Sequence, residues 1–426
     1  MKKNIFSSIG IFFLLVILFI IIGLFLIDKN IFSLKTKLYN KFPNIELRLH
    51  ILNKKSVIKN LKNDYNVKFL PFTQFEKFQY SKKKVEFENN LISKSKNKDK
   101  SISYKKYNSF FLDEYKSNII ITDFLGNIYF VKKNDLFSKK KEDLFANNIL
   151  SDFKPVRVFD AFIYKDKIFI SHTLNKKGCK TINISSALIN YEKLNFRQFY
   201  KSNECNKTGS PGRIQFFQYN NIPGLLLSTS EGKRDKPGVN TQNAKSVYGK
   251  ILFIPFNGSQ EIIYSLGHRV IQGLSVYENI IIATEHGPRG GDEINLILNQ
   301  KNYGWPEVSL GERYDFEYKN MNLKYKKNHK NNNFEEPIFS FIPSIGISEI
   351  VKLPSSFSIY YEDHYLLSSL NGGSLYFIRF DNNKSKIVTI ERVFLNNRIR
   401  DVKILKNNDI ILALEENAEI GILRKE

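Results

Sequence analysis

A short unit recurs six times along this chain and limits the folds that it can adopt. Each copy has three or four apolar residues, a small or hydroxyl residue and a polar turn, and several copies continue into a second apolar strand. The copies begin at residues 119, 168, 225, 280, 365 and 410. Repeats of this size with several strands each are typical of propeller blades. The pattern predicts an all-β fold, a six-bladed β-propeller, with a large β-sandwich as the competing all-β fold.

The composition agrees with an all-β chain that has a large core. Apolar residues make up 42% of the sequence and aromatic residues 14%, and aromatic side chains favour strands. No amphipathic pattern with a 3.6-residue period interrupts the repeats, which disfavours alternating strands and helices.

The first residues predict a membrane anchor. Ile5 to Ile27 is a stretch of 23 residues without a charge, and about 20 apolar residues span a bilayer as a helix. A cleaved signal peptide is the alternative, but the stretch is long for one and no small-residue cleavage site follows it. We therefore predict an anchor over residues 1–28, a Lys-rich membrane-proximal stalk over 29–107 that has a candidate strand near residues 65–78, and the propeller over 108–426.

The chain has a formal net charge of +23, which would suit nucleic acid, anionic lipid or an acidic partner. Lysine is, however, scattered among asparagines in every polar stretch, and no basic helix or RNA-binding signature accompanies it. We predict no nucleic-acid partner, and the sequence does not indicate an oligomeric state.

Cys179 and Cys205 are the two cysteines of the chain, and 26 positions separate them. Both stand in polar loop sequence rather than in apolar core, which favours a disulfide over two unpaired thiols. A disulfide requires an oxidising compartment, so the pair favours a periplasmic or extracellular propeller.

The fourth repeat runs into a glycine-rich turn at residues 287–291 that exposes backbone carbonyls beside Glu285, Asp292 and Glu293. Carbonyl and carboxylate oxygens are the ligands of hard cations such as Ca²⁺. The alternative is a tight structural turn whose acids pair with Arg289 and nearby lysines.

This stretch, TEHGPRGGDEINLI followed by NYGWP, resembles the signature of the soluble quinoprotein glucose/sorbosone dehydrogenase family. Four further pieces match the family in order: GHRVIQGL at 267–274, PSIG at 343–346, SLNGGSLY at 369–376 and RIRDV at 398–402. The resemblance covers roughly residues 110–426.

The resemblance implies a six-bladed propeller that oxidises a sugar hydroxyl with pyrroloquinoline quinone (PQQ), held through Ca²⁺. The residues that match the family's calcium positions are Gly287 and Pro288 for the calcium of the cofactor, and Glu293 and Tyr303 for a second, structural calcium. Those that match its quinone positions are Arg269, Gln272, Arg398 and Arg400. Guanidinium groups suit this cofactor, which bears three carboxylates, because they bind carboxylates in a bidentate manner. For the two arginines of RIRD, the alternative is a salt bridge with Asp401.

The sequence also departs from the family pattern. The general base of the family is a histidine that takes the hydroxyl proton, and Gly209 occupies its position in GSPGR. His172 is a weak candidate for a relocated base, while Val270 and Asn371 replace an asparagine and a lysine of the family. Two functions therefore stay open. One is a membrane-anchored, periplasmic, PQQ-dependent sugar dehydrogenase, and the other is a non-catalytic, calcium-stabilised propeller that binds a glycan or protein ligand.

Overall fold

A computed structural model of the chain describes residues 68–70, 78–87, 109–138, 144–176, 178–208, 210–232, 240–312 and 325–425. The chain divides into two units, residues 1–59 and 60–426, and every described residue lies in the second. The predicted membrane helix, the GSPGR glycine Gly209 and most of the predicted stalk lie outside the described residues. Within the described ranges, no helix is long and apolar enough to cross a membrane.

The described residues form five sheets, three of which are four-stranded and antiparallel. The first consists of β7 (Arg157–Tyr164), β8 (Lys167–Lys176), β9 (Cys179–Leu188) and β11 (Arg197–Asn206). The second consists of β12 (Pro211–Tyr219), β13 (Ile222–Thr229), β14 (Lys250–Pro255) and β15 (Ile262–Leu266). The third consists of β16 (Ile271–Tyr277), β17 (Ile280–Glu285), β18 (Asp292–Leu296) and β19 (Phe339–Phe341). The helices of the described part are short: α5 (Lys133–Leu136), η3 (Lys330–Asn332) and η4 (Ile359–Tyr361).

The other two sheets include strands from the N-terminal part of the second unit. The five-stranded sheet contains β20 (Ile347–Lys352), β21 (His364–Ser369), β22 (Ser374–Phe380), β23 (Ile387–Phe394) and β1 (Lys68–Leu70). The nine-stranded sheet contains β3 (Phe110–Tyr115), β4 (Asn118–Asp123), β5 (Ile128–Lys132), β6 (Leu144–Ser151), β2 (Phe78–Phe87), β24 (Ile399–Ile404), β25 (Ile410–Leu414), β26 (Glu419–Lys425) and β10 (Lys193–Leu194), which pairs with β6.

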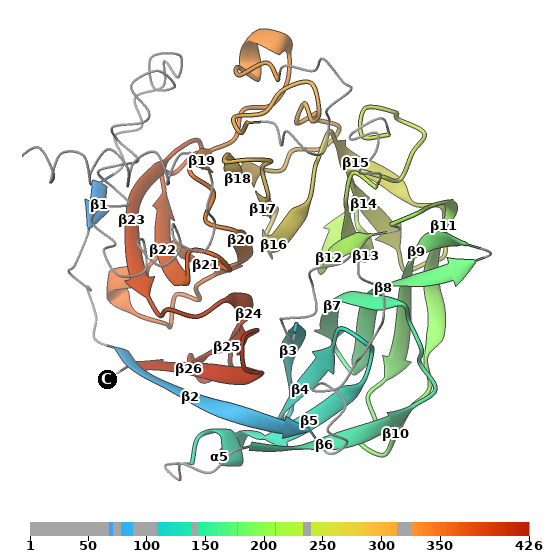
Figure 1. The fold of residues 1–426 in the computed structure, drawn as a ribbon, viewed down its shortest axis with the longest axis vertical. Coiled ribbons are helices and arrows are strands. Elements are labelled where there is room, and N and C mark those ends of the chain that lie inside the picture. The colour runs from blue at the N-terminus through green and yellow to red at the C-terminus, as the bar shows by residue number, and fades with distance from the viewer. Residues whose placement is uncertain are drawn as a thin grey trace, which may run out of the picture. The chain divides into compact units, whose positions relative to one another are not determined.

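The sheets are arranged about a common centre (Figure 1). Their innermost strands β3, β7, β12, β16, β20 and β24 contact one another in this order, and β24 contacts β3, which closes the circuit. The fold is therefore all-β and propeller-like, as the sequence predicts, and it is not a pair of packed sheets.

Each copy of the sequence repeat forms the strand next to the innermost one, in the order β4, β8, β13, β17, β21 and β25. These strands are almost fully buried; β4, β21 and β25, for example, have no exposed residue. Strands covered on both faces are continuous apolar runs rather than alternating patterns. The burial therefore explains why these strands gave the clearest signal in the sequence.

Strand β2 joins the two ends of the described chain. It pairs antiparallel with β26 from Phe78 to Lys84, and then parallel with β6 from Val85 to Phe87. Figure 1 shows β2 running along β26 towards β6. Because β26 is the last strand and β6 an early one, β2 connects the C-terminal strands to the first ones by continuous backbone hydrogen bonding.

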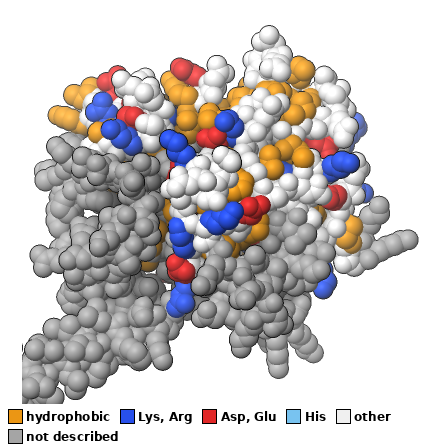
Figure 2. Space-filling model, turned by 90° about the horizontal axis from the view of Figure 1, so that it is seen from above, with side chains coloured by type: hydrophobic (Ala, Val, Ile, Leu, Met, Phe, Trp, Pro, Cys, Tyr) orange, Lys and Arg blue, Asp and Glu red, His pale blue; other side chains and the backbone are white. Residues whose placement is uncertain are grey.

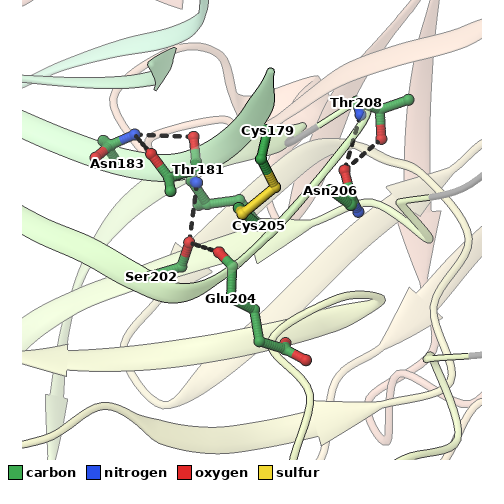
Figure 3. The surroundings of a disulfide bond; sticks show 9 residues. Cys179, Thr181, Asn183, Ser202, Glu204, Cys205, Asn206 and Thr208 are labelled. Atoms are coloured by element: carbon green, nitrogen blue, oxygen red, sulfur yellow. Dashed lines mark hydrogen bonds between the residues drawn. A yellow bond between two sulfur atoms is a disulfide. The ribbon is translucent and has the colours of Figure 1, made fainter. Parts of the chain in front are cut away.

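The predicted disulfide is present. Cys179 at the start of β9 and Cys205 near the end of β11 are bonded (Figure 3). Around the bridge, Ser202 accepts a hydrogen bond from the Ile182 amide at 3.0 Å and donates one to the Glu204 carbonyl at 2.6 Å. The bridge therefore ties neighbouring strands of one sheet together at a polar edge.

Lys and Arg side chains are interspersed with Asp and Glu on the described part of the face drawn in Figure 2. The expectation that the chain has no nucleic-acid partner stays a prediction.

Candidate functional site

The glycine-rich turn connects β17 to β18, and its backbone is compact. Gly290 and Gly291 have φ angles of +87° and +72°, which side chains with a Cβ rarely adopt. A Cβ on Gly287 would lie 2.2 Å from the Gly291 carbonyl oxygen. The Gly287 amide donates to Oδ1 of Asp292 at 3.1 Å, which fixes the turn. Glycine is therefore required for the chain to fold back on itself here.

Arg269 lies against this turn. Its Nη1 donates to the carbonyl oxygens of His286 at 3.1 Å and Gly287 at 2.9 Å. The guanidinium also lies over the ring of Trp305, 5.3 Å from the ring centre. Arg269 thus contacts one of the carbonyls predicted to bind calcium, and that oxygen keeps a second lone pair for a cation.

One pocket brings together several of the predicted residues. Its lining includes Arg269, Gly287, Pro288, Glu293, Tyr303 and Trp305. Burial, followed by the charges of Glu285, Glu336 and Asp292, raises the pKa of Glu293 well above its ordinary value. Tyr303 donates its hydroxyl proton to the Leu296 carbonyl.

These residues fit a calcium ion, because a cation would offset the repulsion between the buried carboxylates around Glu293. Within the described ranges, no three or more His, Cys, Asp or Glu side chains are arranged to hold a metal ion. The calcium positions Gly287, Pro288, Glu293 and Tyr303 stay predictions.

Arg398 and Arg400 share one buried carboxylate. The Nε atom of Arg398 lies 3.3 Å from Oε2 of Glu415, and Nε of Arg400 bonds Oε1 of the same group. Burial alone would raise the pKa of Glu415, but Arg400 and Arg398 together bring it below its ordinary value. Asp401, the alternative partner of these arginines, pairs with Arg213 instead.

Gln272 contacts Arg400, whose Nη1 donates to Oε1 of Gln272 at 3.0 Å. Burial lowers the pKa of His286, and the positive charges of Arg269 and Arg400 act in the same direction, although Asp292 opposes them. Gln272 follows Arg269 closely in the chain and accepts a hydrogen bond from Arg400, so these arginines belong to neighbouring segments. Such a set of guanidinium groups fits a ligand with several carboxylates.

The other predicted positions are His172, Val270 and Asn371. His172 is buried in β8, where its Nε2 is 2.8 Å from Oγ of Ser185 and its ring packs against Phe153. The carbonyl of Val270 accepts the His286 amide hydrogen at 3.0 Å. Asn371 belongs to the turn between β21 and β22. His172 as a relocated base stays a prediction.

A buried arginine was missed by the sequence analysis. Arg213 in β12 is 4% exposed, and its Nη1 lies 3.0 Å from carboxylate oxygens of Asp160 in β7, Glu349 in β20 and Asp401 in β24. We call these four residues the Arg213 hub. A signal was present, because each acid interrupts an apolar strand, and buried charges require partners.

The hub makes the stability of the protein depend on pH. Burial, assisted by Asp401 and Asp160, raises the pKa of Glu349 to about 8, although Arg213 opposes the shift. The folded state therefore holds a proton that the unfolded chain releases near its ordinary, lower pKa. Stability from this group is fully present below the unfolded pKa and is lost as the pH rises through about 8.

We expect Glu349→Gln to remove part of this dependence. The free energy of unfolding should fall less steeply between pH 5 and 8 in the variant, by up to about 1.4 kcal/mol per pH unit. Urea unfolding at several pH values measures the slope. Glu419→Gln, at a surface pair with Lys82, serves as the control, and identical slopes for parent and Glu349→Gln would contradict the assignment.

Comparisons with known proteins agree with the geometry. The aldose sugar dehydrogenase YliI of Escherichia coli is 30% identical over 155 residues, which cover 35% of this chain and 40% of that protein. The apo-form of the soluble aldose sugar dehydrogenase from Escherichia coli has a TM-score of 0.61 at 18% identity, covering 75% of this chain and 96% of that one. The PQQ-bound aldose sugar dehydrogenase from Streptomyces coelicolor has a TM-score of 0.54 at 17% identity, covering 75% and 94%. At such identities the structures show a shared fold alone.

The chain spans 52% or less of the length of the curated relatives that it matches. The sequence profile of the glucose/sorbosone dehydrogenase family, in contrast, matches residues 109–424, which is most of this chain. The chain therefore belongs to the glucose/sorbosone dehydrogenase family.

Proposed function

We propose that this protein is a PQQ- and calcium-dependent sugar dehydrogenase, anchored in the inner membrane with its propeller in the periplasm. The observation that carries the proposal is the cluster of Arg269, Arg398 and Arg400 near the carbonyl-bearing turn at residues 287–291. Membership of the family and the fold shared with a PQQ-bound aldose sugar dehydrogenase support it.

In this proposal the propeller has six blades. The nine-stranded sheet counts as two blades, one built on β3 to β6 and the other on β24 to β26, with β2 running between them. The site lies where loops from several blades meet, as ligand sites of propellers do.

The side chains have distinct tasks in this site. Arg269, Arg398 and Arg400 would hold the carboxylates of the quinone through charge-assisted hydrogen bonds, and Gln272 would orient Arg400. The bound quinone supplies the acceptor for the hydride that leaves the sugar. The carbonyls of Gly287 and Pro288 would hold the calcium beside it.

The proposed location rests on the disulfide and on the apolar stretch from Ile5 to Ile27. Disulfides persist in oxidising compartments, and the apolar stretch is long enough to span a bilayer. Thiol labelling of the protein recovered from intact cells checks the location. Reactive Cys179 and Cys205 in that material would argue for a reducing compartment.

Binding of PQQ tests the function. We expect PQQ with calcium to stabilise the full chain by about 2.7 kcal/mol at a concentration 100 times its Kd. Trp305 is the only tryptophan of the chain and packs under Arg269, so its fluorescence reports binding at the site. Reduction of an artificial dye in the presence of aldoses then measures turnover.

Matched variants sharpen this test. Arg400→Gln should weaken PQQ binding at least about tenfold, because a hydrogen bond to a charged group contributes about 1.5–3 kcal/mol. Arg424→Gln removes an arginine that pairs with Asp409 and should leave binding unchanged. No stabilisation at saturating PQQ would rule out the enzyme, and binding without dye reduction would favour the alternative of a non-catalytic propeller.

Calcium removal gives a separate prediction. A chelator should lower the stability of the parent chain by about 2.7 kcal/mol relative to calcium at 100 times its Kd, and Glu293→Gln should reduce this loss because it removes a ligand of the second, structural calcium. Glu419→Gln should stay as sensitive as the parent. Thermal unfolding with and without chelator makes the measurement, and a parent chain that does not respond would remove the metal site.

A further inference from the structure

The two side chains that meet in the quinone site, Gln272 and Arg400, both belong to β-bulges. The pairing of β16 with β17 shifts between Ile271 and Gly273, and that of β24 with β25 shifts between Ile399 and Asp401. A bulge leaves its extra residue out of the ladder and redirects its side chain. The carbonyl of such a residue needs a partner from elsewhere when it is buried.

Arg213 provides that partner in both cases. Its Nε donates to the Gln272 carbonyl at 2.6 Å, and its Nη2 donates to the Arg400 carbonyl at 2.9 Å. The third nitrogen, Nη1, faces the three carboxylates of the hub. One guanidinium therefore binds the main chain of two bulges, on β16 and β24, while acids on β7, β20 and β24 hold the guanidinium itself.

We propose that Arg213 is a positioning residue for the quinone site, which sets the distance and orientation of the Gln272 and Arg400 side chains by holding the carbonyls of their bulges. The proposal rests on the proposed function. The guanidinium of Arg213 is engaged by the two carbonyls and the three carboxylates, so Arg213 acts through the two residues that it holds.

The planar guanidinium fork is essential to this role. An arginine presents five N–H donors in fixed directions, whereas a lysine ammonium has three donors at one point. Lysine at position 213 would keep a positive charge among the three carboxylates, but it could not reach both bulge carbonyls with this geometry. Arg213→Lys therefore keeps the positive charge at position 213 but removes the hydrogen bonds to the Gln272 and Arg400 carbonyls.

The test compares Arg213→Lys with Asp113→Asn. Asp113 is also a buried charge on an innermost strand; it pairs with Lys403 at 2.7 Å and accepts the Ile163 amide hydrogen at 2.7 Å. It has no contact with Arg213, Gln272 or Arg400 among the hydrogen bonds of the described residues. Both variants should lose stability, but Arg213→Lys alone should disturb the site.

The first measurement is hydrogen exchange of the full chain without quinone. Peptides that contain residues 271–274 and 399–402 should exchange faster in Arg213→Lys than in the parent, and at the parent rate in Asp113→Asn. The second is PQQ titration followed by Trp305 fluorescence. Arg213→Lys should weaken binding at least about tenfold, and Asp113→Asn should change it by less than about threefold.

The outcomes separate the two proposals. Unchanged exchange in Arg213→Lys, or an equal loss of PQQ affinity in both variants, overturns the positioning role. A parent chain that binds no PQQ overturns the proposed function. In that case, faster exchange in Arg213→Lys still shows that Arg213 holds the two bulges, and equal exchange shows that it does not.

Discussion

Arg213→Met is expected to lower the free energy of unfolding by about 3–5 kcal/mol at pH 8, because it leaves buried carboxylates without their cation. Asp160, Glu349 and Asp401 lie around Arg213 on three different strands. Burial raises the pKa of Asp160 to about 6 and that of Glu349 to about 8. The loss should be smaller at pH 5, where Asp160 and Glu349 are protonated and need no cation.

Urea unfolding at pH 5 and pH 8 measures the effect. Arg424→Met is the control, since Arg424 forms a partly exposed pair with Asp409 at 3.4 Å, and such pairs contribute about 0–1 kcal/mol. A loss below about 1 kcal/mol for Arg213→Met at pH 8 would mean that the hub carboxylates find other partners.

Val85→Asp is expected to detach the end of β2 at a cost of about 3 kcal/mol or more, because it buries a charge without a partner. Val85 is 3% exposed and packs in a cluster with Leu144, Ile420 and Ile422. Its amide donates to the Ala418 carbonyl at 3.0 Å. The substitution therefore acts where β2 passes from β26 to β6.

The matched control is Gln79→Asp, which places the same new charge at an exposed position of the same strand and should change stability by less than about 0.5 kcal/mol. Thermal and urea unfolding of both variants make the comparison. Equal stability of the two variants would show that β2 does not contribute to the closure of the fold.

The strands that the sequence predicts best are those covered on both faces, such as β4 and β25, because burial leaves a continuous apolar run. Strand β2 has no such run. Three consecutive lysines, Lys82 to Lys84, interrupt the alternation of apolar and polar residues that marks a strand. The pairing of β2 with β26 depends on residues at the opposite end of the chain. Such distant pairing leaves little mark on local sequence.

The site shows the same division. The sequence predicts the turn at residues 287–291 because its glycines and acids stand together, and it predicts the disulfide because both cysteines stand in polar sequence rather than in apolar core. The pairing of Arg398 and Arg400 with Glu415, in contrast, was not predicted, because the alternative to a quinone-binding role was a salt bridge with Asp401. Asp401 instead lies 3.0 Å from Arg213, because the β-bulge at this point of β24 turns the Arg400 side chain in another direction.

The pairing of β2 with β26 also sets an order for biosynthesis. Lys82 and Glu419, which meet at 3.0 Å, lie 337 positions apart. At synthesis rates of about 5–20 residues per second, β2 would wait about 17–70 s for its partner strand. Throughout that interval the edge of β2 that later pairs with β26 has no neighbour, and edges of this kind recruit strands from other chains. The growing polypeptide therefore has an unpaired strand edge at β2 until its last strand, β26, is made.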